Sequence, residues 1–400
     1  MKKYVFKEID LTEFEKSAQG IGYLNFLQTA AMARVFADRN YQLHYFVGFE
    51  NDEVKLLALL TAVPIFGGLK FELRFGPSFL DNEGSFDEAL FFQFLNYLKN
   101  YVKSSNGLIL KVIPDLEFSS EFLKKMSAQD FVHTSPESGY DEGEPTWHYV
   151  KELTGLSDAK ALMKSYSKDG QYSVKRTQQF GISVRALAYD ELSKFKSITE
   201  ATSERRGYND HDLEYYQVFY KAFADKAQFL VAEINFQDYV SALKEQIAKL
   251  QSQIDNSNSL KKEKQRQEWQ SQIQSQEKRL EEVAPFLEKY QDKHIILAGG
   301  LFVENDKEMI YLFSGSYEEF KHFYAPFAIQ HFIMTQALEK KIPLYNFYGI
   351  TGNFDGSDGV LHFKENFNGH PVRKIGSFCY YPHPLKHQFI QFVKKILRRT

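Results

Sequence analysis

The chain has 400 residues, with 49 basic against 52 acidic side chains and a formal net charge of −3. Its length is enough for two domains with sizeable cores, whereas its near-zero charge excludes a protein that coats nucleic acid through overall basicity. The single cysteine, Cys379, excludes an internal disulfide and a thiolate metal cluster.

The aromatic content of the chain bears on its packing, and the opening segment bears on its cellular compartment. The 37 Phe and 24 Tyr residues suit packed cores and stacking surfaces. The segment from Met1 to Asp10 becomes charged before an apolar stretch can form, so we expect no signal peptide. No apolar run approaches the ~20 residues needed to span a bilayer. We therefore expect a cytoplasmic protein.

The first half of the chain alternates between strand and helix patterns. Thr29 suits the N-cap of the alanine-rich helix that follows it. A further helix is expected at Asp87–Lys103. Strands are expected at Tyr41–Gly48, Val54–Val63 and Gly107–Ile113, and from Phe66 to a stop at Gly76-Pro77. This alternation predicts a mixed α/β domain.

A basic stretch, Leu162–Ile182, contains four cations and interleaved tyrosines but a single acid. Helical spacing puts Lys168, Lys175 and Arg176 on roughly one side, together with Tyr172. Cations and aromatic rings on one face suit a phosphate backbone with a stacked base. An ordinary solvated helix face is equally compatible with the pattern. A strand at Ile182–Ala188 then begins a second α/β unit.

From Tyr239 the composition changes to Lys, Glu, Gln, Leu and Ile. Two apolar heptad stripes flank a polar break at Asp255–Ser259, and they predict an antiparallel helical hairpin. Each helix would project ~30 Å or more. Pro285 is expected to end or kink the second helix. The first stripe is Leu243, Ile247, Leu250 and Ile254, and the second is Trp269, Ile273, Leu280, Val283 and Leu287.

The closing part has a strand pair, His294–Val303 and Glu308–Ser316, and a helix with Pro326 in its first turn. A strand from Tyr345 follows. The next segment, rich in Gly, Asn, Asp and Ser, is too turn-rich for regular structure. It presents one lysine, Lys364, next to the aromatic Phe363. A cation held on such a loop could stabilise the oxyanion of an acyl-transfer intermediate, and a solvated surface lysine is the plainer interpretation.

The segment Phe354-Asp-Gly-Ser-Asp-Gly-Val-Leu-His-Phe-Lys-Glu-Asn-Phe367 resembles the signature of the Fem family, and within it the streptococcal MurM/MurN branch. These are aminoacyl-tRNA-dependent transferases that build peptidoglycan cross-bridges. The resemblance extends over most of the chain. It implies an α/β (α+β) fold of two GNAT-like acyltransferase domains, with an inserted antiparallel coiled-coil helical arm that is similar to the arm of seryl-tRNA synthetase.

The resemblance also assigns roles to residues. Lys364 is implied as the catalytic cation, and the basic stretch as a tRNA-binding face through Lys168, Lys175 and Arg176. The implied substrate-binding residues are Arg34, His211, Tyr215, Tyr311, Phe313, Tyr324 and Phe363.

Some positions depart from the family pattern. Phe36 stands where a family lysine contacts a phosphate, so Arg34 is the nearest cation. His211 replaces an arginine or lysine, and Phe313 replaces a tyrosine. A family aspartate falls on Ile113, with Asp115 close by, so no general base is identified.

The expected reaction is transfer of an amino acid, alanine or serine, from aminoacyl-tRNA to the stem peptide of lipid-linked peptidoglycan precursor (lipid II). No metal is expected, because no second ligand lies at ligand spacing from His211, and no cofactor is expected. Two alternatives stay open: a non-catalytic coiled-coil protein that docks on tRNA or membrane, and an acyl-CoA-dependent GNAT enzyme, although the coenzyme A loop is absent. The basic amphipathic tail, Leu385–Arg399, could lie on the inner membrane face.

The expected organisation has five parts. They are a first GNAT-like domain (1–152), the first part of a second (153–238), the arm (239–292), the second part of the second domain (293–379) and a C-terminal helix (380–400).

Overall fold

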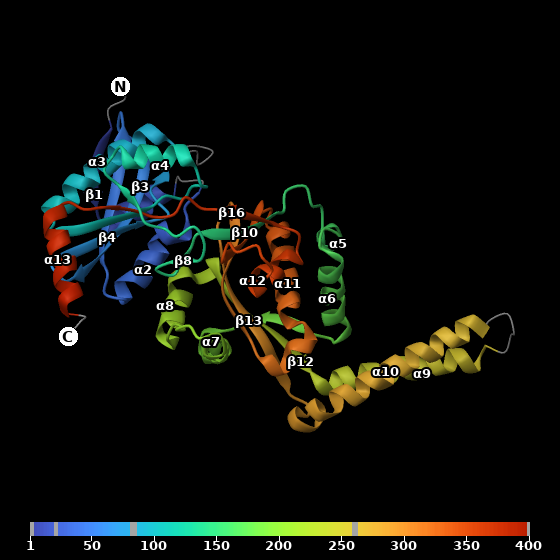
Figure 1. The fold of residues 1–400 in the computed structure, drawn as a ribbon. Coiled ribbons are helices and arrows are strands. Elements are labelled where there is room, and N and C mark those ends of the chain that lie inside the picture. The colour runs from blue at the N-terminus through green and yellow to red at the C-terminus, as the bar shows by residue number, and fades with distance from the viewer. Residues whose placement is uncertain (1–3, 20–22, 81–85, 258–262, 398–400) are drawn as a thin grey trace.

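The computed structural model describes residues 4–19, 23–80, 86–257 and 263–397. It contains two large mixed sheets and a pair of long helices that projects from the second sheet (Figure 1). Both ends of the chain lie on the half that contains the first sheet (Figure 1).

The first sheet has the strand order β1-β2-β3-β4-β6-β17-β7, and β5 pairs with β3. Side chains alternate across it. Phe46 of β2 faces the core under α3, whereas its neighbours Tyr45 and Val47 face the core under α1 and α2. The strands are β1 (Val5–Ile9), β2 (Gln42–Glu50), β3 (Glu53–Ile65), β4 (Gly68–Arg74), β5 (Ser78–Phe79), β6 (Gly107–Ile113), β7 (Val132–His133) and β17 (Phe378–Tyr380). The helices are α1 (Leu11–Ala18), α2 (Ala30–Asp38), α3 (Glu88–Ser104) and α4 (Ser120–Ser127).

The second sheet has the order β11-β12-β13-β14-β15-β10-β16. Helices α5, α6 and α11 cover one side of it, and α7 and α8 cover the other (Figure 1). The strands are β10 (Trp147–Glu152), β11 (Ser183–Ala186), β12 (Ala227–Asn235), β13 (His294–Glu304), β14 (Glu308–Ser316), β15 (Leu344–Ile350) and β16 (His370–Arg373). The helices are α5 (Ala159–Lys164), α6 (Lys168–Gln179), α7 (Leu192–Arg206), α8 (Leu213–Phe223), α11 (Ala325–Glu339) and α12 (Gly359–Glu365).

The two halves share a hydrophobic core, because α2 of the first half packs against α8 of the second. A small hairpin, β8 (Tyr140–Asp141) with β9 (Glu144–Pro145), lies between them. The fold class expected from the sequence is confirmed: two GNAT-like mixed α/β halves with an inserted antiparallel helical arm. The linear domain boundaries stay a prediction, since β10 pairs within the second sheet although it precedes residue 153, and β17 pairs within the first.

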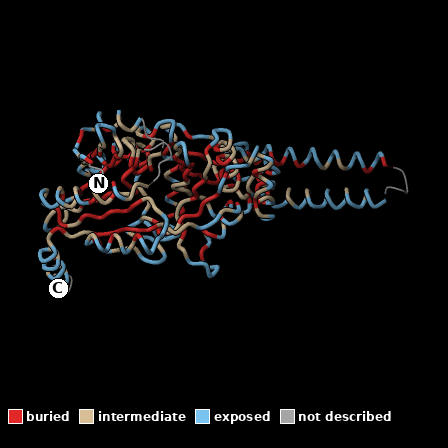
Figure 2. The backbone as a smooth tube through the Cα atoms, turned by 90° about the horizontal axis from the view of Figure 1, so that it is seen from above, coloured by how far each residue is buried: buried red, intermediate tan, exposed pale blue. Residues whose placement is uncertain are grey.

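The arm consists of α9 (Phe236–Asp255) and α10 (Glu263–Tyr290), which lie side by side and extend away from the rest of the molecule (Figure 2). Leu243 and Ile254 of the first predicted stripe and Val283 of the second are buried between them or at the arm's base. Of the two outcomes expected at Pro285, an end of the second helix is wrong: the helix continues to Tyr290, because the lost backbone hydrogen bond is one of many in a 28-residue helix. A kink at Pro285 stays a prediction.

The last helix, α13 (Pro384–Leu397), lies on the half with the first sheet, on the side away from the arm (Figure 1). Ile390 is its buried contact, and Gly67 allows the close approach: a Cβ at Gly67 would lie 2.2 Å from Ile390 Cδ1. None of the helices in the described part of the chain has the length and apolar character needed to cross a bilayer.

Candidate functional site

The main cavity opens where two neighbouring strands of the second sheet stop pairing. Strands β14 and β15 run parallel and pair only at their beginnings, Glu308–Ile310 with Leu344–Asn346. Beyond that point both strands contribute walls to a cavity of about 770 Å³, which we call the Lys364 cavity. Helices α7, α11 and α12, the loop between α7 and α8, and the hairpin β8–β9 also line it.

Lys364 lies on a helix rather than on a loop, which corrects the expectation from the sequence. Asp358 caps α12 by accepting hydrogen bonds from the backbone N–H groups of Val360 and Leu361, at 2.8 and 3.0 Å. The same carboxylate accepts from the Thr351 hydroxyl, 2.7 Å away. A turn-rich segment therefore supplies its own helix start.

The Lys364 side chain is buried at the wall of the cavity. The residue is 4% exposed, and Nζ donates to the carbonyl oxygen of Gly349 at 2.5 Å and to that of Tyr348 at 3.4 Å. Burial lowers the pKa of the lysine from 10.5 to about 7, although the charge of Asp358 opposes this. Two carbonyl oxygens thus hold a poorly solvated amine whose charge is easily changed.

Aromatic side chains also contribute to the wall of the cavity. The His211 ring stacks on Tyr215 with centroids 3.9 Å apart, and the Phe313 ring meets His211 edge-on at 5.1 Å. Burial lowers the pKa of His211, so the neutral imidazole is favoured. Tyr311 stacks on Phe302 at 5.1 Å, and burial raises its pKa to about 12.

The structure brings together most, but not all, of the predicted substrate residues. His211, Tyr311, Phe313 and Phe363 line the Lys364 cavity, and Tyr215 supports it from behind His211. Tyr324 lines a different cavity, at the base of the arm. Arg34 is exposed on α2, forms an ion pair with Glu15, and lines neither of these two cavities.

The predicted tRNA-binding residues lie together on α6, outside the Lys364 cavity. Lys168 and Lys175 are exposed, and Arg176 is half-buried with its guanidinium 4.5 Å from the ring centroid of Phe180. Tyr172, on the same helix, is 56% exposed.

Sequence reasoning missed two cations of the Lys364 cavity, Arg205 and Arg206, at the end of α7. Arg205 donates to the Ser316 carbonyl oxygen at 3.0 Å. Within the described residues, Arg206 has no carboxylate at ion-pair distance, so its charge is directed at the cavity and its rim. Their adjacency in the sequence was the signal, since two neighbouring arginines before a glycine turn often end a helix with cations.

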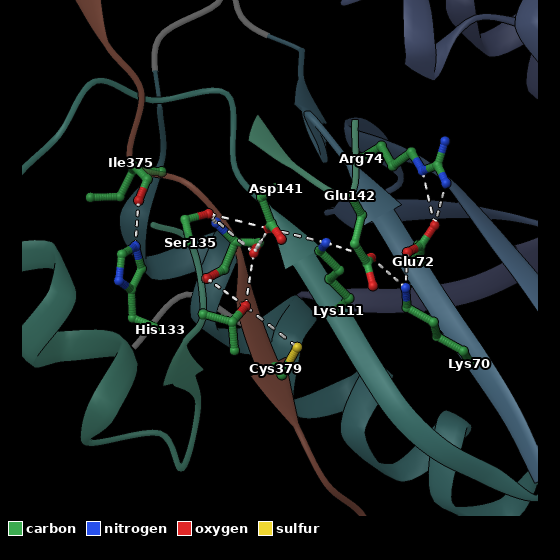
Figure 3. Close-up of polar contacts among 12 residues, drawn as sticks. Lys70, Glu72, Arg74, Lys111, His133, Ser135, Asp141, Glu142, Ile375 and Cys379 are labelled. Carbon is green, nitrogen blue, oxygen red and sulfur yellow. Dashed lines mark hydrogen bonds and ion pairs between the residues drawn. The ribbon is translucent and has the colours of Figure 1, made fainter. Parts of the chain in front are cut away.

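The hairpin β8–β9 closes one side of the cavity through Tyr140 and Gly143. Figure 3 shows how charges fix it to the first sheet: Lys111 of β6, which is 3% exposed, contacts Asp141 at 3.1 Å and Glu142 at 2.8 Å. Burial raises the pKa of Glu142, but hydrogen bonds from Lys111 and Lys70 overcome this and bring it to about 2.

A second, interdomain cavity of about 350 Å³ lies behind the first, and Tyr348 lines both. It contains Asp115, the carboxylate nearest to the family's aspartate position. Asp115 is paired with Lys374 at 2.6 Å and accepts from the Tyr23 hydroxyl at 2.9 Å. Burial alone would raise the pKa of Asp115, but Lys374 and these hydrogen bonds keep it below its usual value. A carboxylate so stabilised is a weak base.

Known proteins match the chain along nearly its whole length. The FemAB family model matches residues 9–395. The aminoacyltransferase FemA of Staphylococcus aureus (strain MW2) is 28% identical over 93% of this chain and 94% of its own length. The crystal structure of FemX superposes with a TM-score of 0.76 at 20% identity, covering 96% of this chain and 99% of that one, which shows a shared fold.

Proposed function

The chain belongs to the FemAB family, and we propose that this aminoacyltransferase transfers an amino acid from aminoacyl-tRNA to the stem-peptide branch of lipid-linked peptidoglycan precursor. FemA, its relative along nearly the whole length, is named as an aminoacyltransferase. The observation that carries the proposal is the buried Lys364 amine at the wall of a cavity large enough for a peptide end.

The reaction joins the acceptor amine to the activated ester of the donor. The amine nitrogen forms a bond to the ester carbonyl carbon, whose oxygen becomes an oxyanion. The C–O bond to the tRNA then breaks, and the ribose hydroxyl leaves with the proton that the amine gives up. Because the ester is already activated, the enzyme needs to align the two groups and stabilise the oxyanion.

Lys364 is our choice for the group that stabilises the oxyanion. With its pKa lowered to about 7 by burial, the free enzyme holds both forms of the amine at neutral pH. An oxyanion beside Nζ favours the charged form. The ammonium therefore becomes fully charged as negative charge develops, when its effect on the barrier is largest.

The finer identity of the substrates is proposed from the signature around Lys364. Its similarity to the MurM/MurN branch favours alanine or serine as the donated residue, and addition of the second residue of the branch. Arg205 and Arg206 provide cations for a phosphate of the acceptor, and the exposed face of α6 provides Lys168 and Lys175 for the donor RNA.

A lipid-linked acceptor requires contact with the membrane, and we propose that α13 makes it on the inner face. Leu385, Phe389 and Phe392 are 82%, 66% and 62% exposed, and their spacing places them on one helical face. Residues 380–400 contain no Asp or Glu, and Lys386 and Lys394 lie among these apolar residues. An exposed apolar face with cations and no acids suits an anionic bilayer surface.

The test is transfer of radiolabelled amino acid from a panel of charged tRNAs to unbranched and singly branched lipid-linked precursor. We expect label on the precursor with an alanyl or seryl donor, and none with the Lys364→Ala variant. Acetyl-CoA serves as the control donor. Label from acetyl-CoA but not from charged tRNA, or normal turnover by Lys364→Ala, would contradict the proposal.

A further inference from the structure

A third cavity, of about 490 Å³, lies where the arm meets the body of the second half; we call it the arm-base cavity. Helix α6, both arm helices and the segment before α11 line it. Tyr324, immediately before α11, belongs to this cavity, whereas Pro326 and Ile329 of α11 belong to the Lys364 cavity. The two cavities are therefore neighbours across the first turn of α11.

Two buried polar atoms in this lining have no partner. The Tyr239 hydroxyl and the Arg176 Nε atom make no hydrogen bond, although Tyr239 is only 4% exposed. Arg176 uses Nη1 to donate to Gln179 at 2.9 Å. Burial raises the pKa of the Tyr239 hydroxyl, and the charges of Arg279 and Arg176 oppose this increase. Both guanidinium groups therefore lie close enough to Tyr239 to act on its hydroxyl. Buried groups left unpaired are costly, which points to a ligand that supplies acceptors.

The charges of the cavity are also uncompensated. In the part of the chain that the structure describes, neither Arg176 nor Arg279 has a carboxylate within ion-pair distance, although Glu282 lines the same cavity. Arg279 donates only a long hydrogen bond, 3.4 Å, to Gln276 of its own helix. Two arginines free to bind oxygen atoms in a planar, forked geometry suit a phosphate.

Aromatic rings surround these cations. Tyr172, which is 56% exposed, meets Tyr324 edge-on with centroids 6.2 Å apart. Phe180 lies under the Arg176 guanidinium and packs on Phe323 at 5.1 Å. Exposed aromatic faces beside unpaired arginines are the combination that holds an unstacked base together with its phosphate.

We propose that the arm-base cavity binds one unpaired nucleotide of RNA, with its base against Tyr172 and Tyr324 and its phosphate against Arg176 and Arg279. This rests on the proposed function, because the donor tRNA supplies the RNA. The end of a tRNA that carries the amino acid is single-stranded, and single strands are where proteins reach base faces. The nucleotide held here would precede the aminoacyl end that enters the neighbouring Lys364 cavity.

The experiment measures binding by fluorescence anisotropy, over a range of salt concentrations, with two probes: uncharged tRNA and a short labelled single-stranded RNA. The full chain is compared with Tyr172→Leu, Arg176→Gln and Tyr239→Phe, and with Lys160→Gln as a matched control, since Lys160 is an exposed cation on α5 outside the cavity. Circular dichroism checks that each variant is folded.

We expect Tyr172→Leu, which removes a ring that stacks on the base, and Arg176→Gln, which removes a phosphate contact, each to weaken binding of both probes about 10-fold or more. Tyr239→Phe removes only the unpaired hydroxyl and should weaken binding about 3-fold to 10-fold. Arg176→Gln should also reduce the slope of log affinity against log salt by roughly 0.7, the share of one single-strand phosphate. Tyr172→Leu should leave that slope unchanged, and Lys160→Gln should leave affinity within about 2-fold.

Transfer kinetics separate this proposal from the proposed function. If the wild type transfers amino acid and the cavity variants raise the KM for charged tRNA with kcat unchanged, both proposals stand. If it transfers but the variants bind RNA normally, the arm-base site is wrong and the function stands. A rise in the KM of the lipid-linked acceptor instead would assign the cavity to that substrate and overturn the RNA site. A wild type that binds RNA in this cavity without transferring would overturn the function alone.

Discussion

Replacing Lys364 by methionine should make the protein more stable at the same time as it abolishes transfer. The side chain is buried and, among the residues that the structure describes, its Nζ atom donates hydrogen bonds only to the backbone carbonyl oxygens of Gly349 and Tyr348. Methionine fills nearly the same volume without an ionisable group. A buried charge such as the Lys364 ammonium lowers the stability of the fold, and proteins retain such groups where the function needs them.

The magnitude follows from the pKa. Burial lowers it from 10.5 to about 7, and at ~1.36 kcal/mol per unit of pKa this corresponds to about 5 kcal/mol against folding at low pH. The folded value lies below the unfolded value, so the unfolded chain binds more protons and the stability of the wild type rises with pH. Loss of the carbonyl hydrogen bonds offsets part of the gain, which leaves Lys364→Met about 2–3 kcal/mol more stable near pH 6.

The assay is urea unfolding of wild type and Lys364→Met between about pH 6 and about pH 9. Over this window the stability advantage of the variant should shrink by about 2.5 kcal/mol, because folding of the wild type releases the proton of Lys364 and this release costs less as pH rises. Lys160→Met, at an exposed position on α5, is the control and should show no such trend. A stability difference that stays constant with pH, or grows, would refute the argument that this amine is desolvated.

The remaining predictions concern the contacts of the hairpin β8–β9 with the first sheet and the exposed face of helix α13. Lys111→Met should lower the free energy of unfolding by about 3 kcal/mol, because it leaves the largely buried Asp141 unpaired, whereas Lys125→Met, which breaks exposed pairs, should cost less than about 1 kcal/mol. The pKa of Glu142 is about 2 in the folded wild type, below its value in the unfolded chain. The wild type should therefore lose stability as pH falls from about 4.5 towards 2. Urea unfolding should show a smaller loss of stability over this range in Lys111→Met, because that variant lacks one of the cations that lower the pKa. The double variant Phe389→Ser/Phe392→Ser should bind anionic vesicles about 10-fold more weakly than the wild type in a sedimentation assay. The control Phe354→Ser, which changes another exposed phenylalanine, should bind as the wild type does. Equal binding by all three proteins would contradict the membrane role of α13.

Local sequence patterns were enough to predict the elements that depend on local interactions. Thr29 accepts a hydrogen bond from the Met32 N–H and begins α2 as expected. The stripes of the arm gave both helices and their antiparallel arrangement, because heptad spacing determines which face is apolar. The domain boundary could not be read in the same way. Whether β10 and β17 pair with the first or the second sheet depends on contacts between residues more than 190 positions apart in the chain. Strand β10 pairs with β15 and β16, and strand β17 pairs with β6 and β7.

The prediction that Lys364 lies on a loop was wrong for a different reason. The run of Gly, Asn, Asp and Ser before it is typical of a loop, but Asp358 within that run caps a helix. The burial of Lys364 could not be predicted from the sequence, because the carbonyl groups that accept from its Nζ atom belong to β15. The walls of the cavity around them come from α11 and α7. The significance of Arg205 and Arg206 comes from the fold, because α7 places them beside β14.

The contacts around Tyr348 show why the site needs both halves of the chain. Lys111 in the first sheet holds the hairpin β8–β9, and Glu144 of that hairpin accepts a hydrogen bond from the Tyr348 hydroxyl at 2.9 Å. The backbone carbonyl of Tyr348, together with that of Gly349, receives Lys364. Tyr348 has a positive φ of 61°, a conformation that a tyrosine adopts only when its surroundings impose it. Three successive contacts therefore connect a buried charge in the first sheet to the Lys364 amine in the second half, and the position of that amine depends on the junction between the two halves.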